Sequence, residues 1–165
     1  MKRLAREVDI PGTHDTIKLL LIGDVVAKLG RHVLAEALPT LQKKYKPDAI
    51  IANVENLAHG KGVTVKTLRE LSDLGISAFT GGNHAWKKED PASDEIRGRF
   101  PIALPANDPR TIQPLASTSI EVAGETLHII NLLGQLEMGE EGIASPFSAF
   151  DTLYDRLGEP KFLLL

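Results

Sequence analysis

Polar side chains able to bind a metal ion follow three successive apolar segments of the sequence. The segments end in Gly23-Asp24, in Asn53-Val54-Glu55-Asn56 and in Gly81-Gly82-Asn83-His84. Carboxylates, carboxamides and one imidazole, without any thiol, form a mainly hard ligand set that suits Mn, Fe, Mg or Zn. Five residues are therefore candidates for a divalent-metal centre: Asp24, Glu55, Asn56, Asn83 and His84.

Each of these groups also has an ordinary structural explanation. Gly-Asp after a strand is a common turn, and the polar residues after the second segment fit a solvated loop. Gly81-Gly82-Asn83 fits a turn with positive φ angles. Their convergence favours a site, because ligands of open parallel sheets bind beyond the carboxyl ends of the strands, where loops from neighbouring strands meet.

The elements that must position these residues alternate between strand and helix. Compact apolar runs predict buried strands at 17–22, 48–53 and 76–80, and helical spacing of apolar residues predicts helices at 30–46 and 64–74. We expect Pro39 to interrupt or kink the first helix, Thr64 to cap the second and Gly75 to end it. Two successive strand–helix–strand units imply right-handed crossovers and a parallel sheet covered by helices.

The second half of the chain has a different pattern. It predicts a short strand at 102–104, hairpin strands at 117–122 and 127–132, a helix at 148–157 and a last strand at 161–165. The hairpin loop is expected at Ala123-Gly124-Glu125-Thr126. Residues 1–16 are polar and show no periodicity, so we expect a poorly ordered lead-in there and a single domain over 17–165.

The composition restricts the partners of the chain. Its 165 residues contain 19 Lys and Arg against 22 Asp and Glu, so no basic patch for nucleic acid or an anionic membrane is evident. No apolar run approaches the roughly 20 residues of a membrane span. The absence of Cys excludes a disulfide framework and a cysteine nucleophile, and it is compatible with a cytoplasmic protein.

One glycine-rich segment is similar to a phosphate-binding loop. In His59-Gly60-Lys61-Gly62, however, the G-x-x-x-x-G-K-[ST] pattern requires Gly where Glu55 stands and Ser or Thr where Gly62 stands. A nucleoside-triphosphate site is therefore rejected. The segment either lines the metal edge or forms an ordinary glycine-rich turn.

Several motifs occur together in one order along the chain. They cover 21–26, 47–56, 60–62 and 80–86, and they continue with 131–134, Met138 and 145–147. Together they resemble the bacterial calcineurin-like metallophosphoesterases of the 2′,3′-cyclic-nucleotide 2′-phosphodiesterase type, from about residue 18 onward. The resemblance implies an α/β fold, a four-layer α/β/β/α sandwich. This chain is expected to be its N-terminal part, incomplete at the C-terminus.

The resemblance also implies a function for each candidate residue. Asp24, Glu55 and Asn56 would be metal ligands, with Glu55 bridging two ions. Asn83 would bind the second ion, and His84 would be the proton donor. The implied cofactors are two divalent metal ions per complete site, of Fe, Mn, Zn or Mg. The implied substrate is a cyclic nucleotide or a related small phosphodiester.

The sequence also departs from the family pattern. Members carry Asp-x-His and Thr-His-Thr-His-like segments further along, whereas no His follows His128 here, and Ala27 and Val54 stand where Gly is usual. We therefore expect weak binding of at most one metal ion and negligible activity from this chain alone. Two alternatives stay open: a truncated, catalytically incompetent remnant or partner-binding domain, and a second polypeptide that supplies the histidines. An unpaired sheet edge would also favour poor solubility or a homo-oligomer.

Overall fold

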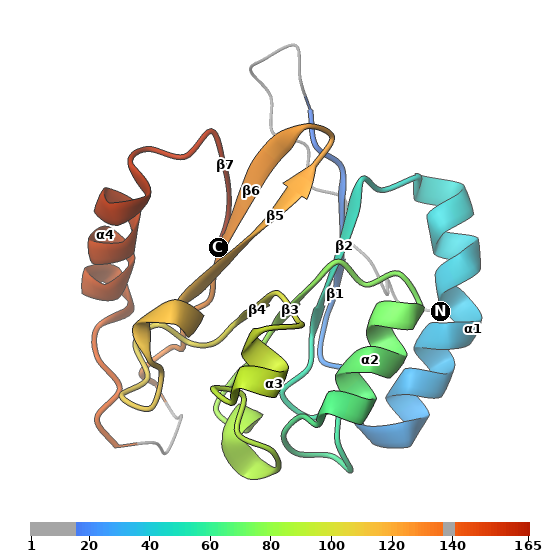
Figure 1. The fold of residues 1–165 in the computed structure, drawn as a ribbon, viewed down its shortest axis with the longest axis horizontal. Coiled ribbons are helices and arrows are strands. Elements are labelled where there is room, and N and C mark those ends of the chain that lie inside the picture. Colours follow the sequence, from blue (N-terminus) through green and yellow to red (C-terminus); the bar gives the residue numbers. More distant parts are fainter. Residues whose placement is uncertain (1–15, 137–140) are drawn as a thin grey trace.

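Four parallel strands, placed side by side in sequence order, form the first sheet of the computed structural model (Figure 1). They are β1 (Leu19–Ile22), β2 (Ala49–Asn53), β3 (Ala78–Thr80) and β4 (Ile102–Ala103). The structure describes residues 16–136 and 141–165. Each strand pairs in parallel with the next, which confirms the predicted parallel sheet.

Helices cover one face of this sheet. They are α1 (Ala27–Tyr45), α2 (Val65–Asp73), the 3-10 helix η1 (Ala85–Lys87) and the short α3 (Asp94–Arg97). Between these helices and the sheet lies a cluster of buried apolar side chains that includes Leu38, Leu68 and Phe79. Burial of such side chains is the main source of stability for helices of this length.

The predictions for α1 and α2 have different outcomes. α1 continues through Pro39, so the expected interruption is wrong, while the alternative of a kink stays a prediction. Pro39 is exposed, and Leu34 and Leu38 on the same helix are buried and hold it to the sheet. α2 agrees with the sequence. Thr64 accepts a hydrogen bond from the Thr67 main-chain nitrogen in a capping box, and Gly75 follows the last turn with φ of 94°.

A second sheet contains β5 (Ser117–Val122), β6 (Glu125–Ile130) and β7 (Phe162–Leu164), in that order. β5 and β6 are antiparallel, and β7 pairs with β6 in parallel. Ala123 and Gly124, with φ of 53° and 83°, make the hairpin turn alone. The predicted four-residue loop is therefore wrong, because a two-residue turn with positive φ at both positions already matches the twist of the strands.

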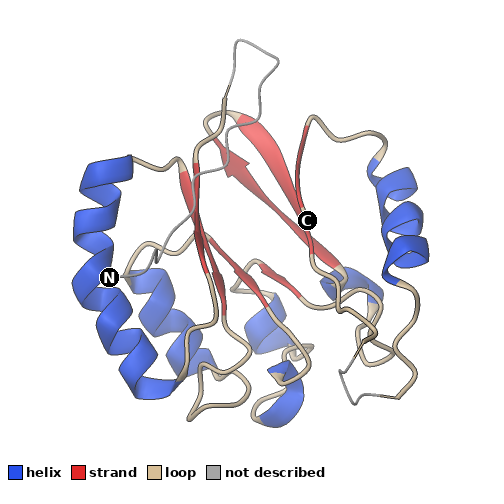
Figure 2. Cartoon of the chain, turned by 180° about the vertical axis from the view of Figure 1, so that it is seen from behind, coloured by secondary structure: helices blue, strands red, loops and turns tan. Residues whose placement is uncertain are grey.

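The two sheets pack face to face, and α4 (Pro146–Leu157) covers the outer face of the second one (Figure 2). Ile51, Leu127 and Ile129 belong to the buried cluster between the sheets. A third cluster, with Ile130 and Leu153, joins the second sheet to α4. The layers are thus helices, sheet, sheet and helix, which confirms the predicted four-layer α/β/β/α sandwich.

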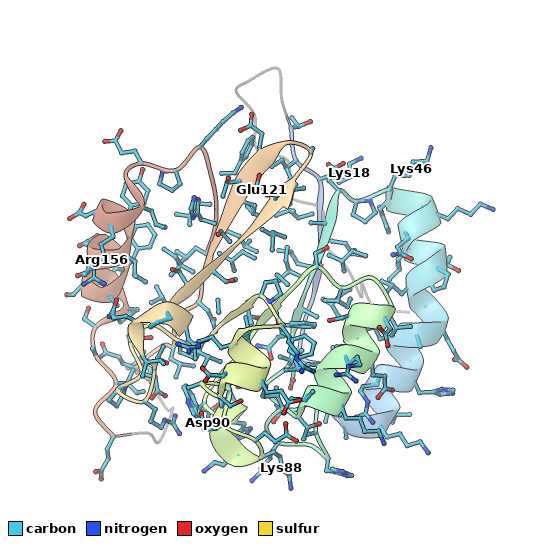
Figure 3. The ribbon with its side chains drawn as sticks, in the orientation of Figure 1. Lys18, Lys46, Lys88, Asp90, Glu121 and Arg156 are labelled. Atoms are coloured by element: carbon cyan, nitrogen blue, oxygen red, sulfur yellow. The ribbon has the colours of Figure 1, made fainter. Side chains whose placement is uncertain are left out.

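Many charged side chains lie on the outside of these layers. All six residues labelled in Figure 3 are exposed: Lys18, Lys46, Lys88, Asp90, Glu121 and Arg156. Within residues 16–136 and 141–165, no helix is long and apolar enough to cross a membrane. The expected lead-in falls outside the described residues except for residue 16, and Met138 of the family motifs falls outside them too.

Candidate metal centre

The loops that follow β1, β2 and β3 are joined by main-chain hydrogen bonds beyond the ends of the strands. The Val25 nitrogen donates to the Asn53 carbonyl at 3.1 Å, which connects the first loop to β2. The Val54 nitrogen donates to the Thr80 carbonyl at 2.9 Å, which connects the second loop to β3. These bonds hold the three loops side by side at the carboxyl edge of the sheet.

A chain of side-chain hydrogen bonds joins residues from all three loops. Asn56 Nδ2 donates to Asp24 Oδ2 at 2.8 Å and to Glu55 Oε1 at 3.3 Å. On the other side of the same amide, Asn56 Oδ1 lies 2.7 Å from His84 Nδ1. The structure therefore brings four of the candidate residues into one connected cluster.

The hydrogen-bonding capacities of these groups assign the proton on His84. An ionised carboxylate only accepts hydrogen bonds, so the Asn56 atom that faces Asp24 and Glu55 must be the amide nitrogen. The amide oxygen then faces His84, and it can only accept. His84 Nδ1 is therefore assigned as the protonated ring nitrogen that donates to Asn56 Oδ1.

The Glu55 carboxylate occupies the space beside Gly82. A Cβ atom added at Gly82 would lie 1.6 Å from Glu55 Oε2, far inside any contact distance. Gly82 does not have a positive φ angle, so the backbone conformation alone does not require glycine there. The glycine is required because the loop after β3 must pass directly over the carboxylate that follows β2.

The main chain around Glu55 is fixed by its own loop. Its nitrogen donates to Asn53 Oδ1 at 3.0 Å, and its carbonyl accepts a hydrogen bond from the Gly62 nitrogen. Val54 is fully buried and its φ angle is not positive, so the replacement of the usual Gly causes no backbone strain. The glycine-rich segment 59–62 forms a turn that closes on Glu55 beside the candidate site.

Asn83 is half-buried on the loop that carries His84. Its carbonyl oxygen accepts a hydrogen bond from Arg110 Nη2 at 3.5 Å. Arg110 and its partner Asp108 follow β4, the fourth strand of the first sheet. Sequence reasoning missed these two residues, although the rule applied to the first three strand ends also covers the fourth.

Comparison with known proteins places the chain in a family. The family model described as YmdB-like protein matches residues 20–165. The chain belongs to the YmdB-like family. A 2′,3′-cyclic-nucleotide 2′-phosphodiesterase of Bacillus subtilis is 40% identical to it over 119 residues, which are 72% of this chain and 45% of that protein.

Solved structures agree with this assignment. A novel phosphatase from Mycoplasma pneumoniae is 29% identical, with a TM-score of 0.78 over 90% of this chain and 53% of that one. A hypothetical protein from Thermus thermophilus is 30% identical, with a TM-score of 0.72 over 88% and 55% of the two chains. The YmdB-like chain has the fold of the metallophosphoesterases and spans about half the length of these relatives.

The side chains at this YmdB-like site fit a hard divalent cation by ligand type. Asp24 and Glu55 share one neutral donor, the Asn56 amide, and neither forms an ion pair with a described residue. Two convergent carboxylates of this kind attract a cation. Among the described residues, no three His, Cys, Asp or Glu side chains form a metal-binding group, so amide oxygens would have to contribute. Ligation by Asn56 would require its amide to turn over, since Nδ2 now faces the carboxylates.

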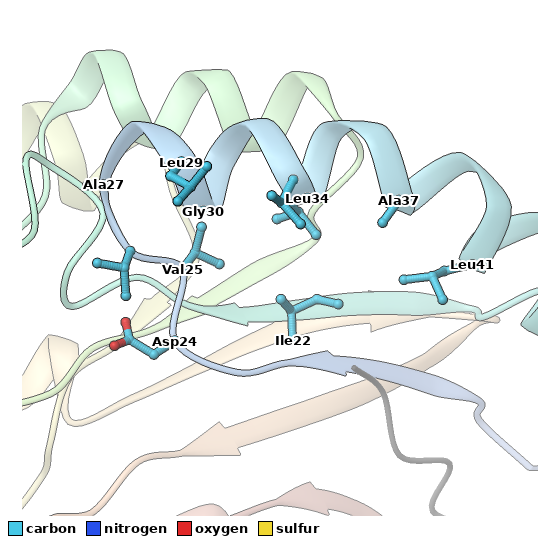
Figure 4. Close-up of a pocket in the computed structure, with 11 residues that line it drawn as sticks. Ile22, Asp24, Val25, Ala27, Leu29, Gly30, Leu34, Ala37 and Leu41 are labelled. Atoms are coloured by element: carbon cyan, nitrogen blue, oxygen red, sulfur yellow. The ribbon is translucent and has the colours of Figure 1, made fainter. Parts of the chain in front are cut away.

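An apolar groove of about 420 Å³ lies beside Asp24, between α1 and the end of β1 (Figure 4). Its lining is almost entirely aliphatic and includes Val25, Leu29, Val33 and Leu41. Leu29 in this lining is 73% exposed. The groove offers a phosphate no cationic side chain, so the polar cluster at the strand ends is the better place for phosphate chemistry.

Proposed function

We propose that this chain contributes a metal site for the hydrolysis of phosphodiesters, with cyclic nucleotides or related small phosphodiesters as substrates. The observation that carries the proposal is the hydrogen-bonded cluster of Asp24, Glu55, Asn56 and His84 at the edge of three parallel strands. The B. subtilis relative, named as a 2′,3′-cyclic-nucleotide 2′-phosphodiesterase, supports the choice of substrate class.

In this proposal the carboxylates hold the metal ions. Asp24 and Glu55 would be ligands, with Glu55 bridging the two ions of a complete dinuclear centre, and Asn56 and Asn83 would add amide oxygens. Divalent ions supply electrostatic stabilisation of the phosphate charge and lower the pKa of water. Because Gly82 has no Cβ atom, the Glu55 carboxylate has space to point into the site.

His84 would act as the proton donor to the leaving alkoxide. Its Nδ1 proton is engaged by Asn56 Oδ1, so Nε2 is the atom that would give up a proton. An imidazole suits this step because its ordinary pKa lies near neutral pH. Asn56 would fix the orientation of the ring as long as its amide oxygen faces His84, and an amide turned over to ligate a metal ion would give up this contact. A cytoplasmic location stays a prediction from the absence of Cys.

The test measures metal binding apart from turnover. Mn²⁺ binding to the purified chain is followed by electron paramagnetic resonance, and Mn²⁺-dependent hydrolysis of 2′,3′-cyclic AMP is assayed in parallel. We expect Asp24→Asn and Glu55→Gln each to weaken Mn²⁺ binding about tenfold or more. His84→Gln should change Mn²⁺ affinity less than about twofold and abolish any Mn²⁺-dependent hydrolysis.

The matched control is Asp151→Asn, which removes an exposed carboxylate on α4. If Asp151→Asn and Asp24→Asn weaken Mn²⁺ binding equally, the strand-end site is the wrong site. If the chain binds Mn²⁺ as expected but shows no hydrolysis, the metal site stands and the alternative of a catalytically incompetent or partner-binding domain is favoured.

A further inference from the structure

We propose that Arg110 is a positioning residue that holds the Asn83–His84 loop in place and thereby sets the affinity of the strand-end site for a divalent cation. The affinity part of this inference rests on the proposed function. The holding of the loop rests on contacts in the structure alone.

Arg110 is anchored to a buried carboxylate. Asp108 is 2% exposed, and its Oδ1 accepts hydrogen bonds from the Arg110 main-chain nitrogen at 2.9 Å and from Nε at 2.8 Å. Arg110 Nη2 donates to the second carboxylate oxygen, Oδ2, so two nitrogen atoms of the guanidinium group bind the two oxygen atoms of the carboxylate. Bidentate pairs of this kind fix the plane of the guanidinium group.

From this anchor Arg110 reaches the loop after β3 in two ways. Its guanidinium carbon lies 4.2 Å from the centre of the Trp86 ring, within cation–π distance. Its Nη2 atom also lies 3.5 Å from the Asn83 carbonyl oxygen. The two contacts are made on either side of His84, so the arginine holds the loop at both ends of the segment that carries the proposed proton donor.

The anchor itself is tied to the segments that follow β6 and precede α4. The Asn107 side chain, next to Asp108, donates to the Leu133 carbonyl at 2.8 Å and to the Ala144 carbonyl at 3.0 Å. The Leu133 nitrogen donates back to Asn107 Oδ1 at 2.9 Å. Arg110 therefore extends from a fixed base, and a movement of the loop after β3 would have to break its contacts.

The same loop is tied from a second direction. Asn131, directly after β6, donates from Nδ2 to the Gly81 carbonyl at 2.7 Å. Asn131 secures the start of the loop, before Gly82 passes over the Glu55 carboxylate. Arg110 secures its far part. Loss of Arg110 would leave the start of the loop in place and remove its contacts to the Asn83 carbonyl and the Trp86 ring.

The experiment uses the fact that Trp86 is the single tryptophan of the chain. Acrylamide quenching of its fluorescence reports how well the ring is covered, and amide hydrogen exchange at Asn83 and His84 reports how firmly the loop is held. Mn²⁺ affinity is measured separately by electron paramagnetic resonance. The variants are Arg110→Ala, Arg110→Lys and the control Arg97→Ala, which removes an exposed arginine paired with Asp94 on α3.

We expect Arg110→Ala to weaken Mn²⁺ affinity about tenfold, as removal of groups that orient metal ligands typically does. Quenching of Trp86 and amide exchange at Asn83 and His84 should both increase. Arg110→Lys should recover part of the quenching protection through its cation but little of the Mn²⁺ affinity, because an ammonium cannot form the bidentate pair. Arg97→Ala should match the wild-type chain in all three measurements.

Ile129→Val, which removes one methyl group from the core between the sheets, is the control for a general loss of stability. If Ile129→Val weakens Mn²⁺ binding as much as Arg110→Ala, or if Arg110→Ala leaves quenching and exchange unchanged, the inference is overturned. If the wild-type chain binds no Mn²⁺, the proposed metal site and the affinity part of the inference fail together. Amide exchange in Arg110→Ala then still decides whether Arg110 holds the loop.

Discussion

The closest steric constraint at the site of this YmdB-like chain is the approach of Gly82 to the Glu55 carboxylate. In Gly82→Ala, the new Cβ would lie 1.6 Å from Glu55 Oε2, so the carboxylate must leave its position. We expect Mn²⁺ affinity to fall about tenfold or more. Because the clash is with the far end of a flexible side chain, the free energy of unfolding should fall by less than about 1 kcal/mol. Mn²⁺ titration and urea unfolding measure the two effects.

The control for this substitution lies on the neighbouring loop. A Cβ atom at Gly23 would meet nothing within 4 Å, and its φ angle is not positive. Gly23→Ala should therefore leave the free energy of unfolding and the Mn²⁺ affinity close to the wild-type values. Equal losses in both variants would mean that any methyl group near the strand ends disturbs the site, and that the Glu55 contact is not special.

A buried carboxylate makes the stability of the chain depend on pH. Burial alone would raise the pKa of Asp108, but its hydrogen bonds and charge interaction with Arg110 outweigh burial, and the pKa lies below the ordinary value of 3.8. A lowered pKa contributes stability that is complete above the ordinary value and is lost as the pH falls through the folded-state value. The contribution of Asp108 is therefore present at neutral pH and declines below pH 3.8.

Asp108→Asn tests this pH dependence. The variant keeps the shape of the side chain but gives Arg110 a neutral partner, so we expect a loss of about 2 kcal/mol in the free energy of unfolding at neutral pH. The difference from the wild-type chain should shrink steadily when urea unfolding is repeated below pH 3.8. A difference that stays constant across that range would show that the charge of Asp108 is not responsible.

Among the secondary-structure elements, the start of α1 carries local strain. Ala27, the first residue of the helix, has a φ angle of 51°, in the left-handed region that costs a residue with a Cβ about 1–2 kcal/mol. Ala27→Gly should remove this cost while adding some entropy to the unfolded chain. We expect a net gain of about 0.5–1 kcal/mol in the free energy of unfolding, measured by urea denaturation.

The backbone contact at this position provides a check on the explanation. The Ala27 nitrogen donates to the Asn56 carbonyl at 2.9 Å, and glycine keeps that bond. Ala37→Gly, in the interior of the same helix, should instead destabilise by about 1 kcal/mol, because no positive φ angle is relieved there. If both glycine substitutions destabilise, strain at Ala27 is not the reason.

The sequence predicts the elements of this fold better than the contacts between their side chains. Apolar runs and helical spacing are local, so they predict β1 to β3, α2 and the polar strand ends at Asp24 and Glu55. The hydrogen bond of Asn56 to His84 joins residues 28 positions apart, and no spacing rule fixes such a pair. An interruption at Pro39 and a four-residue hairpin loop are wrong predictions, because packing of α1 and the twist of the strands outweigh local preference.

Each of the two sheets ends in a strand that pairs on one side only among the described residues. β1 and β7 lie at the ends of their sheets within the part of the chain that the structure describes. Beside β1 lies the apolar groove, and Leu29 and Val33 on its α1 side are 73% and 45% exposed. An apolar patch next to an unpaired strand edge favours association with another polypeptide surface.

We therefore expect the chain to self-associate in a concentration-dependent way through the groove between α1 and β1. Leu29→Glu should shift sedimentation-velocity profiles towards the monomer. Burial of a leucine at an interface contributes about 1.5–3 kcal/mol, so its loss should raise the dissociation constant about tenfold or more. Phe147→Glu is the matched control, since it replaces a side chain that is 79% exposed on α4, outside the groove. A wild-type chain that stays monomeric at all concentrations, or an equal shift in both variants, would contradict association through this groove.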